Sequence, residues 1–321
     1  MRIRPLSISE AAGYEAMARQ YGTLFNTAEW LALFGANMQA LGIFDKGDNL
    51  VGGLSLYQER RWGFRIIRRA PFTPTCGPFF EVKAYNPVAV LEARRNVLEC
   101  LVEYLETEAP ALCMLPLDRG VTDLLPFFWR GWKCIPQYTY LIDLRLSLDQ
   151  LVRNMSSERR KNLSKAKRDE LCIRPTTDMK TVRDLVMATF ARQRKFVDRT
   201  RLEAILFQYA NSSNSFAFTA YREDDPIATC FVVHDAQTAY YLLGGYREDQ
   251  RHHGAGASAM FAAIQHAQQI GLKRFDFEGS VIPAIERYFR GFGGQLIPYF
   301  TVNKAWLPVE LALKFVKRSI F

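Results

Sequence analysis

The chain contains one pattern twice, two apolar runs joined by a polar turn, and the second copy lies 177 residues after the first. The first copy is residues 40–44 and 50–57 around the turn 45–49, and the second is residues 216–221 and 227–233 around the turn 222–225. Runs of this length separated by turn residues predict β-hairpins. Trp30 and Phe207 share the offset, and each precedes its hairpin in an expected helix. The spacing predicts a tandem duplication, with chance recurrence of a common hairpin as the alternative.

The segments around the two hairpins predict the α/β class. Residues 238–243, 254–270 and 273–277 have the patterns of a strand, a helix and a strand, and residues 87–106 and 111–115 have those of a helix and a strand in the first half. Helices that connect strands in this order predict a mixed, mostly antiparallel sheet flanked by helices. A length of 321 residues accommodates two such domains. We expect them at residues 1–145 and 146–321.

The composition excludes several protein classes. With 49% apolar and 23% charged residues, the chain is globular rather than disordered. It has no uncharged apolar run of about 18 residues and no apolar core of a signal peptide, which predicts a cytoplasmic protein. The six cysteines form no CxxC pair and the four histidines form no HExxH motif. We therefore expect buried, reduced thiols and no metal site.

Positive charge is concentrated in the second half. Residues 1–145 carry a net charge of +1 and residues 146–321 one of +8. Seven cations lie within 16 residues, opposed only by Glu158. This segment predicts either a surface for a phosphate-rich ligand or a solvated helix face. The cations are Arg153, Arg159, Arg160, Lys161, Lys165, Lys167 and Arg168.

Glycines follow an arginine where a strand leads into a helix. Arg251, Gly254 and Gly256 fit the Arg/Gln-x-x-Gly-x-Gly/Ala pattern with which Gcn5-related N-acetyltransferases (GNAT) hold the pyrophosphate of coenzyme A. Backbone amides at a helix start attract such an anion, and glycine lets it approach closely. These residues are candidates for binding an acyl-CoA. A flexible helix N-terminus is the alternative.

Two further segments carry candidate catalytic residues. In the run 274–280 the strand alternation places Asp276 and Glu278 on one face, where paired carboxylates suit a general base or an anchor for an amine. The alternative is an exposed strand end bound to nearby arginines. In the run 285–294, Arg290 lies off the apolar stripe of a short helix and is suited to bind a phosphate or an oxyanion.

These residues together resemble the FemABX family of bacterial nonribosomal peptidyl transferases. The resemblance rests on the sequences FDFEGS at 275–280 and FRGFG at 289–293, and on TYLIDL at 139–144 with the basic run 159–166 after it. NTAEWL at 26–31 and CGP at 76–78 extend it into the first half. It implies two tandem acetyltransferase-like (GNAT) domains over nearly the whole chain. It also implies transfer of an amino acid from aminoacyl-tRNA to the amine of a peptidoglycan or other cell-envelope precursor.

The resemblance assigns roles to particular residues. Phe289 stands where the family has a lysine at the reaction centre, and Arg290 beside it is the nearest cation, which stays protonated and cannot act as a base. Asp118 lies near the family's acceptor-site aspartate. We therefore expect Glu278, Asp276 and Arg290 to be catalytic. The expected substrate-binding residues are Phe289, Ser280, Asp118, Arg159, Arg160 and Lys165.

Two other functions remain open, an acyl-CoA-dependent N-acyltransferase and a noncatalytic binding module of the same fold. The transferase needs no cofactor beyond its donor, and no DNA partner is expected. In the tail, residues 309–321, apolar residues alternate in small groups with Lys314, Lys317 and Arg318. Such a segment either packs on its domain or contacts the inner face of the membrane.

Overall fold

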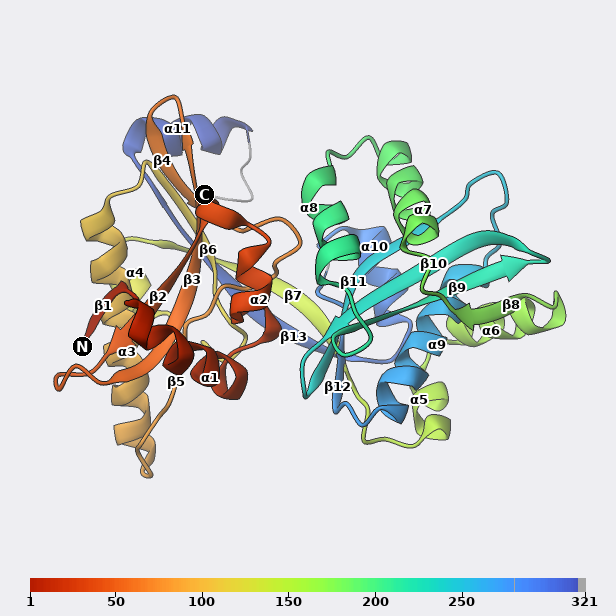
Figure 1. Cartoon of the computed structure of the whole chain (residues 1–321), viewed down its shortest axis with the longest axis horizontal. Helices are drawn as coiled ribbons and strands as arrows, with labels where there is room; N and C mark the ends of the chain where they lie inside the picture. The colour runs from red at the N-terminus through yellow and green to blue at the C-terminus, as the bar shows by residue number, and fades with distance from the viewer. Residues whose placement is uncertain (280, 317–321) are drawn as a thin grey trace. The chain divides into compact units, whose positions relative to one another are not determined.

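The computed structural model describes residues 1–279 and 281–316, which form two compact units. The first unit is Met1–Gln137 together with the segment that begins at Pro298, and the second is Tyr138–Ile297. Each has a mixed, mostly antiparallel sheet flanked by helices, which confirms the predicted fold class (Figure 1).

The first unit contains a six-stranded path in the order β1-β2-β3-β4-β6-β13. Its strands are β1 (Arg2–Pro5), β2 (Met38–Phe44), β3 (Leu50–Arg61), β4 (Phe64–Arg68), β5 (Phe79–Phe80), β6 (Leu112–Pro116) and part of β13 (Gln295–Ala305). Its helices are α1 (Ala11–Tyr21), α2 (Ala28–Ala32), α3 (Pro87–Glu108), α4 (Leu125–Trp129) and α11 (Leu307–Val316). Leu98, Leu101 and Leu105 of α3 pack on one face of the sheet, and Tyr14 of α1 packs with Phe79 in a separate cluster.

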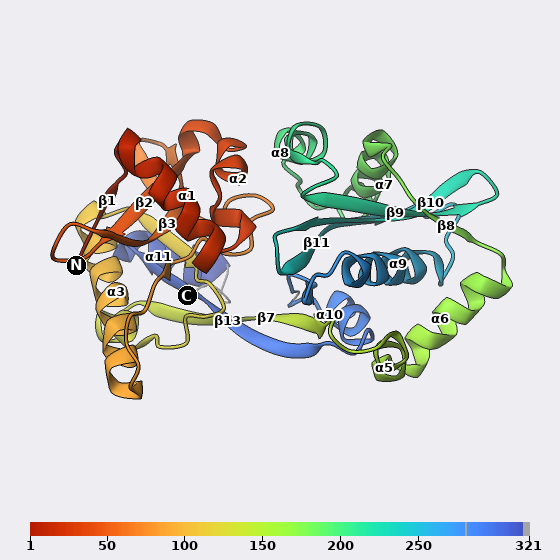
Figure 2. The ribbon, with the colours of Figure 1, turned by 60° about the horizontal axis from the view of Figure 1, so that its bottom comes forward.

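The second unit repeats this arrangement in the order β8-β9-β10-β11-β12-β7. Its strands are β8 (Cys172–Pro175), β9 (Ser215–Arg222), β10 (Asp225–His234), β11 (Thr238–Tyr246), β12 (Arg274–Asp276) and part of β7 (Lys133–Asp143). Its helices are α5 (Leu148–Asn154), α6 (Ser157–Arg168), α7 (Met179–Arg192), α8 (Arg199–Ala204), α9 (Ala255–Gln269) and α10 (Pro283–Arg290). Figure 2 shows α7 and α8 on one face of the sheet and α9 and α10 on the other.

The two sheets share their pairing as well as their order. β2–β3 and β9–β10 are antiparallel hairpins at the two predicted positions. β4–β6 and β11–β12 are parallel, and each is followed by an antiparallel partner, β13 on β6 and β7 on β12. The repeat is thus one of topology, which supports the predicted duplication. It does not extend to burial, because Trp30 is fully buried whereas Phe207 is 47% exposed.

The expected domain boundaries differ from the observed units. The first unit ends at Gln137 rather than at residue 145, and the chain from Pro298 onward belongs to it rather than to the second. The reason is a pairing that sequence proximity does not show. β6 requires a partner along its free edge, and Thr301–Ala305 of β13 supply it. The sixth strand of the first sheet therefore comes from the far end of the chain.

Candidate functional site

The parallel strands β11 and β12 separate at the residues predicted to be catalytic. Their register runs from Thr238 opposite Arg274 to Tyr240 opposite Asp276. β11 then continues to Tyr246, whereas β12 ends. The chain after Asp276 therefore leaves the sheet beside an edge of β11 that has no further pairing among residues 1–279 and 281–316. The conformation of that turn decides where Glu278 points.

Asp276 is a buried carboxylate that shapes this turn. The residue is only 4% exposed. Its Oδ1 accepts a hydrogen bond from the Thr139 hydroxyl at 2.5 Å and another from the Glu278 backbone N–H at 2.8 Å. Hydrogen bonds to an ionised acceptor are stronger than neutral ones. Asp276 thus attaches the turn to β7 and acts as a positioning residue.

Glu278 and Gly279 both have left-handed backbone conformations, with φ of 54° and 75°. Glycine is required at 279, because a Cβ there would lie 2.0 Å from the Tyr138 carbonyl oxygen. A glutamate at positive φ is uncommon and costs conformational energy, as functional turns often do. The expected alternation of Asp276 and Glu278 along one strand is wrong, since β12 ends at Asp276. Ser280 lies outside the described residues.

A second group of polar side chains lies on the other face of β7. Tyr140 follows Thr139 in the strand, so the two side chains point to opposite faces. The Tyr140 hydroxyl donates to Glu286 Oε1 at 2.5 Å, and Nε of Arg290 lies 3.3 Å from the same oxygen. Arg290, which was expected to be catalytic, is exposed and held by this ion pair. Sequence reasoning missed Glu286, although its i,i+4 spacing from Arg290 was a signal.

Tyr140 supplies a pH-dependent test of this contact. Burial and the hydrogen bond to Glu286 raise the pKa of Tyr140 to about 12. The folded protein then holds the phenol proton more tightly than the unfolded chain does. The stabilisation is complete below the unfolded value near 10 and is lost as the pH rises toward 12. We expect Tyr140→Phe to cost about 1.5 kcal/mol at pH 8 and nearly nothing above pH 12.

Urea unfolding of parent and variant at both pH values measures this difference. Tyr138→Phe is the matched control on the same strand, because Tyr138 is 41% exposed. An equal cost of Tyr140→Phe at both pH values would show that Glu286 does not hold this phenol.

Phe289, at the position of the family's lysine, is a core residue. It is 6% exposed, and its ring stacks on Phe277 at 5.0 Å and meets Tyr241 edge-on at 5.6 Å. The expectation that Phe289 binds substrate is therefore corrected: the apolar stripe of α10 turns it inward. Arg290, one residue along the helix, is necessarily directed elsewhere.

Of the two glycines at the start of α9, Gly254 is packed tightly within the unit, whereas Gly256 has space around it. The Gly254 N–H donates to Nδ1 of His252 at 3.0 Å, and Nε2 of His252 lies 2.9 Å from Asp169. A Cβ at Gly254 would lie 2.4 Å from the Asn162 carbonyl oxygen of α6. Gly254 is thus needed for helix packing. At Gly256 a Cβ would meet only the Tyr288 hydroxyl, at 3.6 Å, and Arg251 is exposed beside Glu248.

The basic helix α6 divides into buried, paired and unpaired cations. Arg159 is 5% exposed and lies 4.6 Å above the Tyr288 ring, so its expected contact with substrate is corrected to one in the core. Arg160 donates to the Arg153 and Met155 carbonyls, and Lys165 lies 3.6 Å from Asp169. Among the described residues no ion-pair partner is found for three exposed cations. They are Lys161 and Lys167 in α6 and Arg153 in the preceding helix α5.

Asp118 lies in the first unit, after β6. Its carboxylate accepts from the Gly120 N–H at 2.8 Å and its own N–H donates to the Gly77 carbonyl at 2.9 Å, so it forms a turn there.

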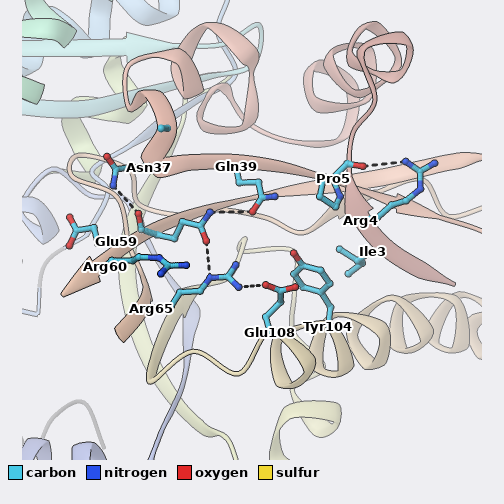
Figure 3. Close-up of a pocket in the computed structure, with 12 residues that line it drawn as sticks. Ile3, Arg4, Pro5, Asn37, Gln39, Glu59, Arg60, Arg65, Tyr104 and Glu108 are labelled. Atoms are coloured by element: carbon cyan, nitrogen blue, oxygen red, sulfur yellow. Dashed lines mark hydrogen bonds and ion pairs between the residues drawn. The ribbon is translucent and has the colours of Figure 1, made fainter. Parts of the chain in front are cut away.

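The same unit has a polar cavity of about 510 Å³ (Figure 3). A network joins Gln39, Gln58, Arg65 and Glu108 along it. None of the predicted site residues lines it.

Within residues 1–279 and 281–316, no cluster of His, Cys, Asp and Glu has the arrangement of a metal site. The six cysteines form no disulfide, and Cys172 is exposed rather than buried. In the same ranges, no helix has the length and apolar character required to cross a bilayer.

Comparison with known proteins identifies the domain type. Residues 151–290 match the family model described as an acetyltransferase (GNAT) domain, and this range contains α9, β12 and α10. No curated protein matches the sequence. The expected acyltransferase class is confirmed at the level of this domain.

The solved structures extend the likeness to the whole chain. FemX is similar with a TM-score of 0.69 and 12% identity, over 98% of this chain and 99% of that one. The C-terminal domain of a putative lysylphosphatidylglycerol synthetase from Agrobacterium fabrum is similar with a TM-score of 0.59 and 12% identity, over 95% of each chain. A tandem GNAT protein from the clavulanic acid biosynthesis pathway is similar with a TM-score of 0.51 and 11% identity, over 94% of this chain and 97% of that one. The fold is thus FemX-like, as the sequence resemblance implied.

Proposed function

We propose that this protein transfers an acyl or aminoacyl group to an amine acceptor and forms an amide. The observation that carries the proposal is the position of the turn after β12, which lies within the matched GNAT domain and carries Glu278 in a conformation held by Asp276. Glu278 is half-buried on the turn that begins where β12 leaves β11, and a carboxylate there is suited to bind or deprotonate an amine. The acceptor we propose is an amine-bearing precursor of peptidoglycan or another cell-envelope polymer.

The reaction follows from the groups at this turn. The amine nitrogen attacks the carbonyl carbon of the donor ester, Glu278 takes the amine proton, and the carbonyl oxygen gains negative charge. The Arg290 guanidinium, held by Glu286 on the other face of β7, binds a phosphate of the donor. Collapse of the intermediate breaks the ester bond, and the proton that Glu278 took passes to the leaving oxygen, which departs as the donor hydroxyl. No cofactor beyond the donor is needed.

We propose aminoacyl-tRNA rather than an acyl-CoA as the donor. The Gly254 amide already donates to His252, and the space beside this glycine is filled by the backbone of α6. Both features remove a contact that the pyrophosphate of coenzyme A would need there. The exposed Lys161 and Lys167 of α6, together with Arg153 of α5, give this segment a surface suited to nucleic-acid phosphates. An acyl-CoA donor remains the second candidate because the GNAT domain matches.

The test is amide formation by the parent, Arg290→Ala and Arg287→Ala, each supplied with charged tRNA or acetyl-CoA and a peptide amine. Arg290→Ala should lower turnover about tenfold because it removes a charge-assisted contact with a donor phosphate. Arg287→Ala is the control, since Arg287 is an exposed cation of the same helix. If the parent turns over with acetyl-CoA and not with charged tRNA, the donor is an acyl-CoA and the proposal of aminoacyl-tRNA is wrong. Absence of turnover with both donors would favour the noncatalytic binding module, and equal loss in both variants would remove Arg290 from the mechanism.

A further inference from the structure

The polar cavity of the first unit lies at the end of α3, on the sheet face that this helix covers. Along β3, Leu54 and Leu56 pack in one core cluster with the leucines of α3. Side-chain alternation directs Gln58 and Arg60 to the same face, and both line the cavity. Because α3 ends at Glu108, these last positions of the strand are not covered by the helix. The inward face therefore changes from apolar to polar at the place where the cavity opens.

Hydrogen bonds fix the side chains on the floor of this cavity (Figure 3). Nε of Arg65 donates to Oε1 of Gln58 at 2.9 Å, and the Gln58 amide donates to Oε1 of Gln39 at 3.3 Å. Arg65 also donates to Glu108, and the Asn37 amide donates to the Gln58 backbone carbonyl at 2.9 Å. No acceptor for the Gln39 amide nitrogen is found within residues 1–279 and 281–316. The floor is thus ordered and retains a free donor.

Two arginines lie directly opposite each other on this floor. Arg60 pairs with Arg65 across the β3–β4 hairpin, and Figure 3 shows both side chains at the cavity. Like charges directly opposite each other on adjacent strands are destabilising. Glu108 compensates Arg65, and Glu10 binds Arg4, the third arginine of the lining, at 2.6 Å. Arg60 is exposed and has no ion-pair partner in the described part of the chain.

The other face of the same hairpin shows how such charges are compensated where they face solvent. Alternation directs Glu59 and Arg61 away from the cavity face. Glu59 forms ion pairs with Arg68 at 2.6 Å and with Arg61 at 3.4 Å. On the cavity face, the charge of Arg60 is left uncompensated beside an ordered set of polar groups. This combination indicates a binding site for an anion.

We propose that this cavity binds a small, hydroxylated organic anion whose carboxylate or phosphate contacts Arg60. A guanidinium binds either group through two parallel N–H···O hydrogen bonds, and an anion beside Arg60 and Arg65 offsets their repulsion. The Gln39 amide nitrogen and the Tyr104 hydroxyl are suited to hydrogen-bond the hydroxyl groups of the ligand. A cavity of about 510 Å³ with polar walls accommodates a sugar-sized polar molecule rather than an apolar one.

This site is independent of the proposed transfer reaction. The cavity lies in the first unit, and none of the residues assigned to the reaction lines it. Binding at the cavity can therefore be measured without an acyl donor or an acceptor.

Calorimetric titration of the full chain with three compounds that share one sugar ring tests the proposal. Glucuronate and glucose 6-phosphate carry an anionic group at C6, where glucose has a hydroxyl. At least one of the two sugar anions should bind at one site per chain. Glucose should bind at least about tenfold more weakly, because it lacks a charge-assisted contact with Arg60. Acetate and inorganic phosphate, which lack the ring, should also bind more weakly than the sugar anions.

Variants of the hairpin locate the bound anion. Arg60→Ala should weaken binding of the sugar anion about tenfold, and Arg60→Lys should weaken it less because the charge remains. Arg61→Ala is the matched control, since Arg61 is the neighbouring exposed arginine on the other face. Because Arg60 is exposed and lies opposite Arg65, Arg60→Ala should not lower the unfolding temperature of the free protein.

Four results would overturn the proposal. The first is that neither sugar anion binds, and the second is that glucose binds as tightly as they do. The third is that acetate and inorganic phosphate bind as tightly as the sugar anions, since the cavity then recognises charge alone. The fourth is that Arg61→Ala weakens binding as much as Arg60→Ala, because the anion is then attracted by the charge of the hairpin as a whole.

Discussion

Gly254→Ala is expected to lower the free energy of unfolding by about 3 kcal/mol, because its Cβ has no space. The new carbon would lie 2.4 Å from the Asn162 carbonyl oxygen and 3.0 Å from the Ala166 backbone nitrogen. Both atoms belong to the backbone of α6, so they cannot rotate away as a side-chain end does. The helices α6 and α9 would have to separate, and the contact of Gly254 with His252 would be lost with them.

The matched control for this prediction is Gly256→Ala, two residues along the same helix. Its Cβ would make an ordinary contact of 3.6 Å with the Tyr288 hydroxyl. Alanine is also a better helix former than glycine by up to about 1 kcal/mol. Chemical denaturation of both variants should show a large loss only at position 254. Equal stability of the two would show that α6 does not pack on the start of α9. Variants at Gly254 therefore cannot test acyl-CoA binding, whereas Arg251→Ala can.

Asp276→Ala is expected to abolish measurable transfer and to cost about 2–3 kcal/mol of stability. The substitution leaves the buried Thr139 hydroxyl and the Glu278 N–H without their acceptor. The turn then no longer holds Glu278 in its left-handed conformation, so the carboxylate is displaced from the reacting amine, and small misplacements cost large factors in rate. Turnover and urea unfolding, measured on the same preparations, separate the two effects.

Asp276→Asn tests the role as a positioning residue. An amide oxygen can still accept both hydrogen bonds, so most of the stability should remain and turnover should be partly retained, with the pH profile of the reaction unchanged. Asp143→Asn, an exposed carboxylate paired with Arg145 on the neighbouring strand, is the control and should change neither quantity. If Asp276→Asn instead loses turnover as completely as Asp276→Ala at full stability, Asp276 is itself the base and not a positioning residue.

The elements and the fold class could be predicted because they depend on local patterns. The two hairpins, the helix expected at residues 254–270 and the helix expected at 87–106 appear with bounds shifted by a few residues. Apolar periodicity and turn residues decide such segments within a short window. The FemX-like fold could be predicted for a second reason, because the motifs around Asp276 and Arg290 resemble the FemABX family. The domain bounds were less accessible, because β13 pairs with a strand far away in sequence.

The candidate site was predicted in part. The segments that carry Asp276, Glu278 and Arg290 do meet β7, but through Thr139, Tyr140 and Glu286, which sequence reasoning did not assign. Phe289 and Arg159 illustrate the opposite error. Both were expected to bind substrate, and both are buried against aromatic rings of one cluster. A motif indicates that a residue type is present at a position, whereas burial depends on what packs against it.

The sequence by itself determined the strands and helices, the repeat at 177 residues, the excess of positive charge in the second half and the resemblance to the FemABX family. Only the tertiary structure decided which of these features are available to a ligand. It placed α6 against Gly254, buried Arg159 and left the apolar stripe of α11 (Leu307, Leu311 and Phe315) in solvent. The physical reason is that periodicity specifies which side chains share a face. The exposure of that face is set by contacts between segments distant in sequence, and these form only when the chain folds.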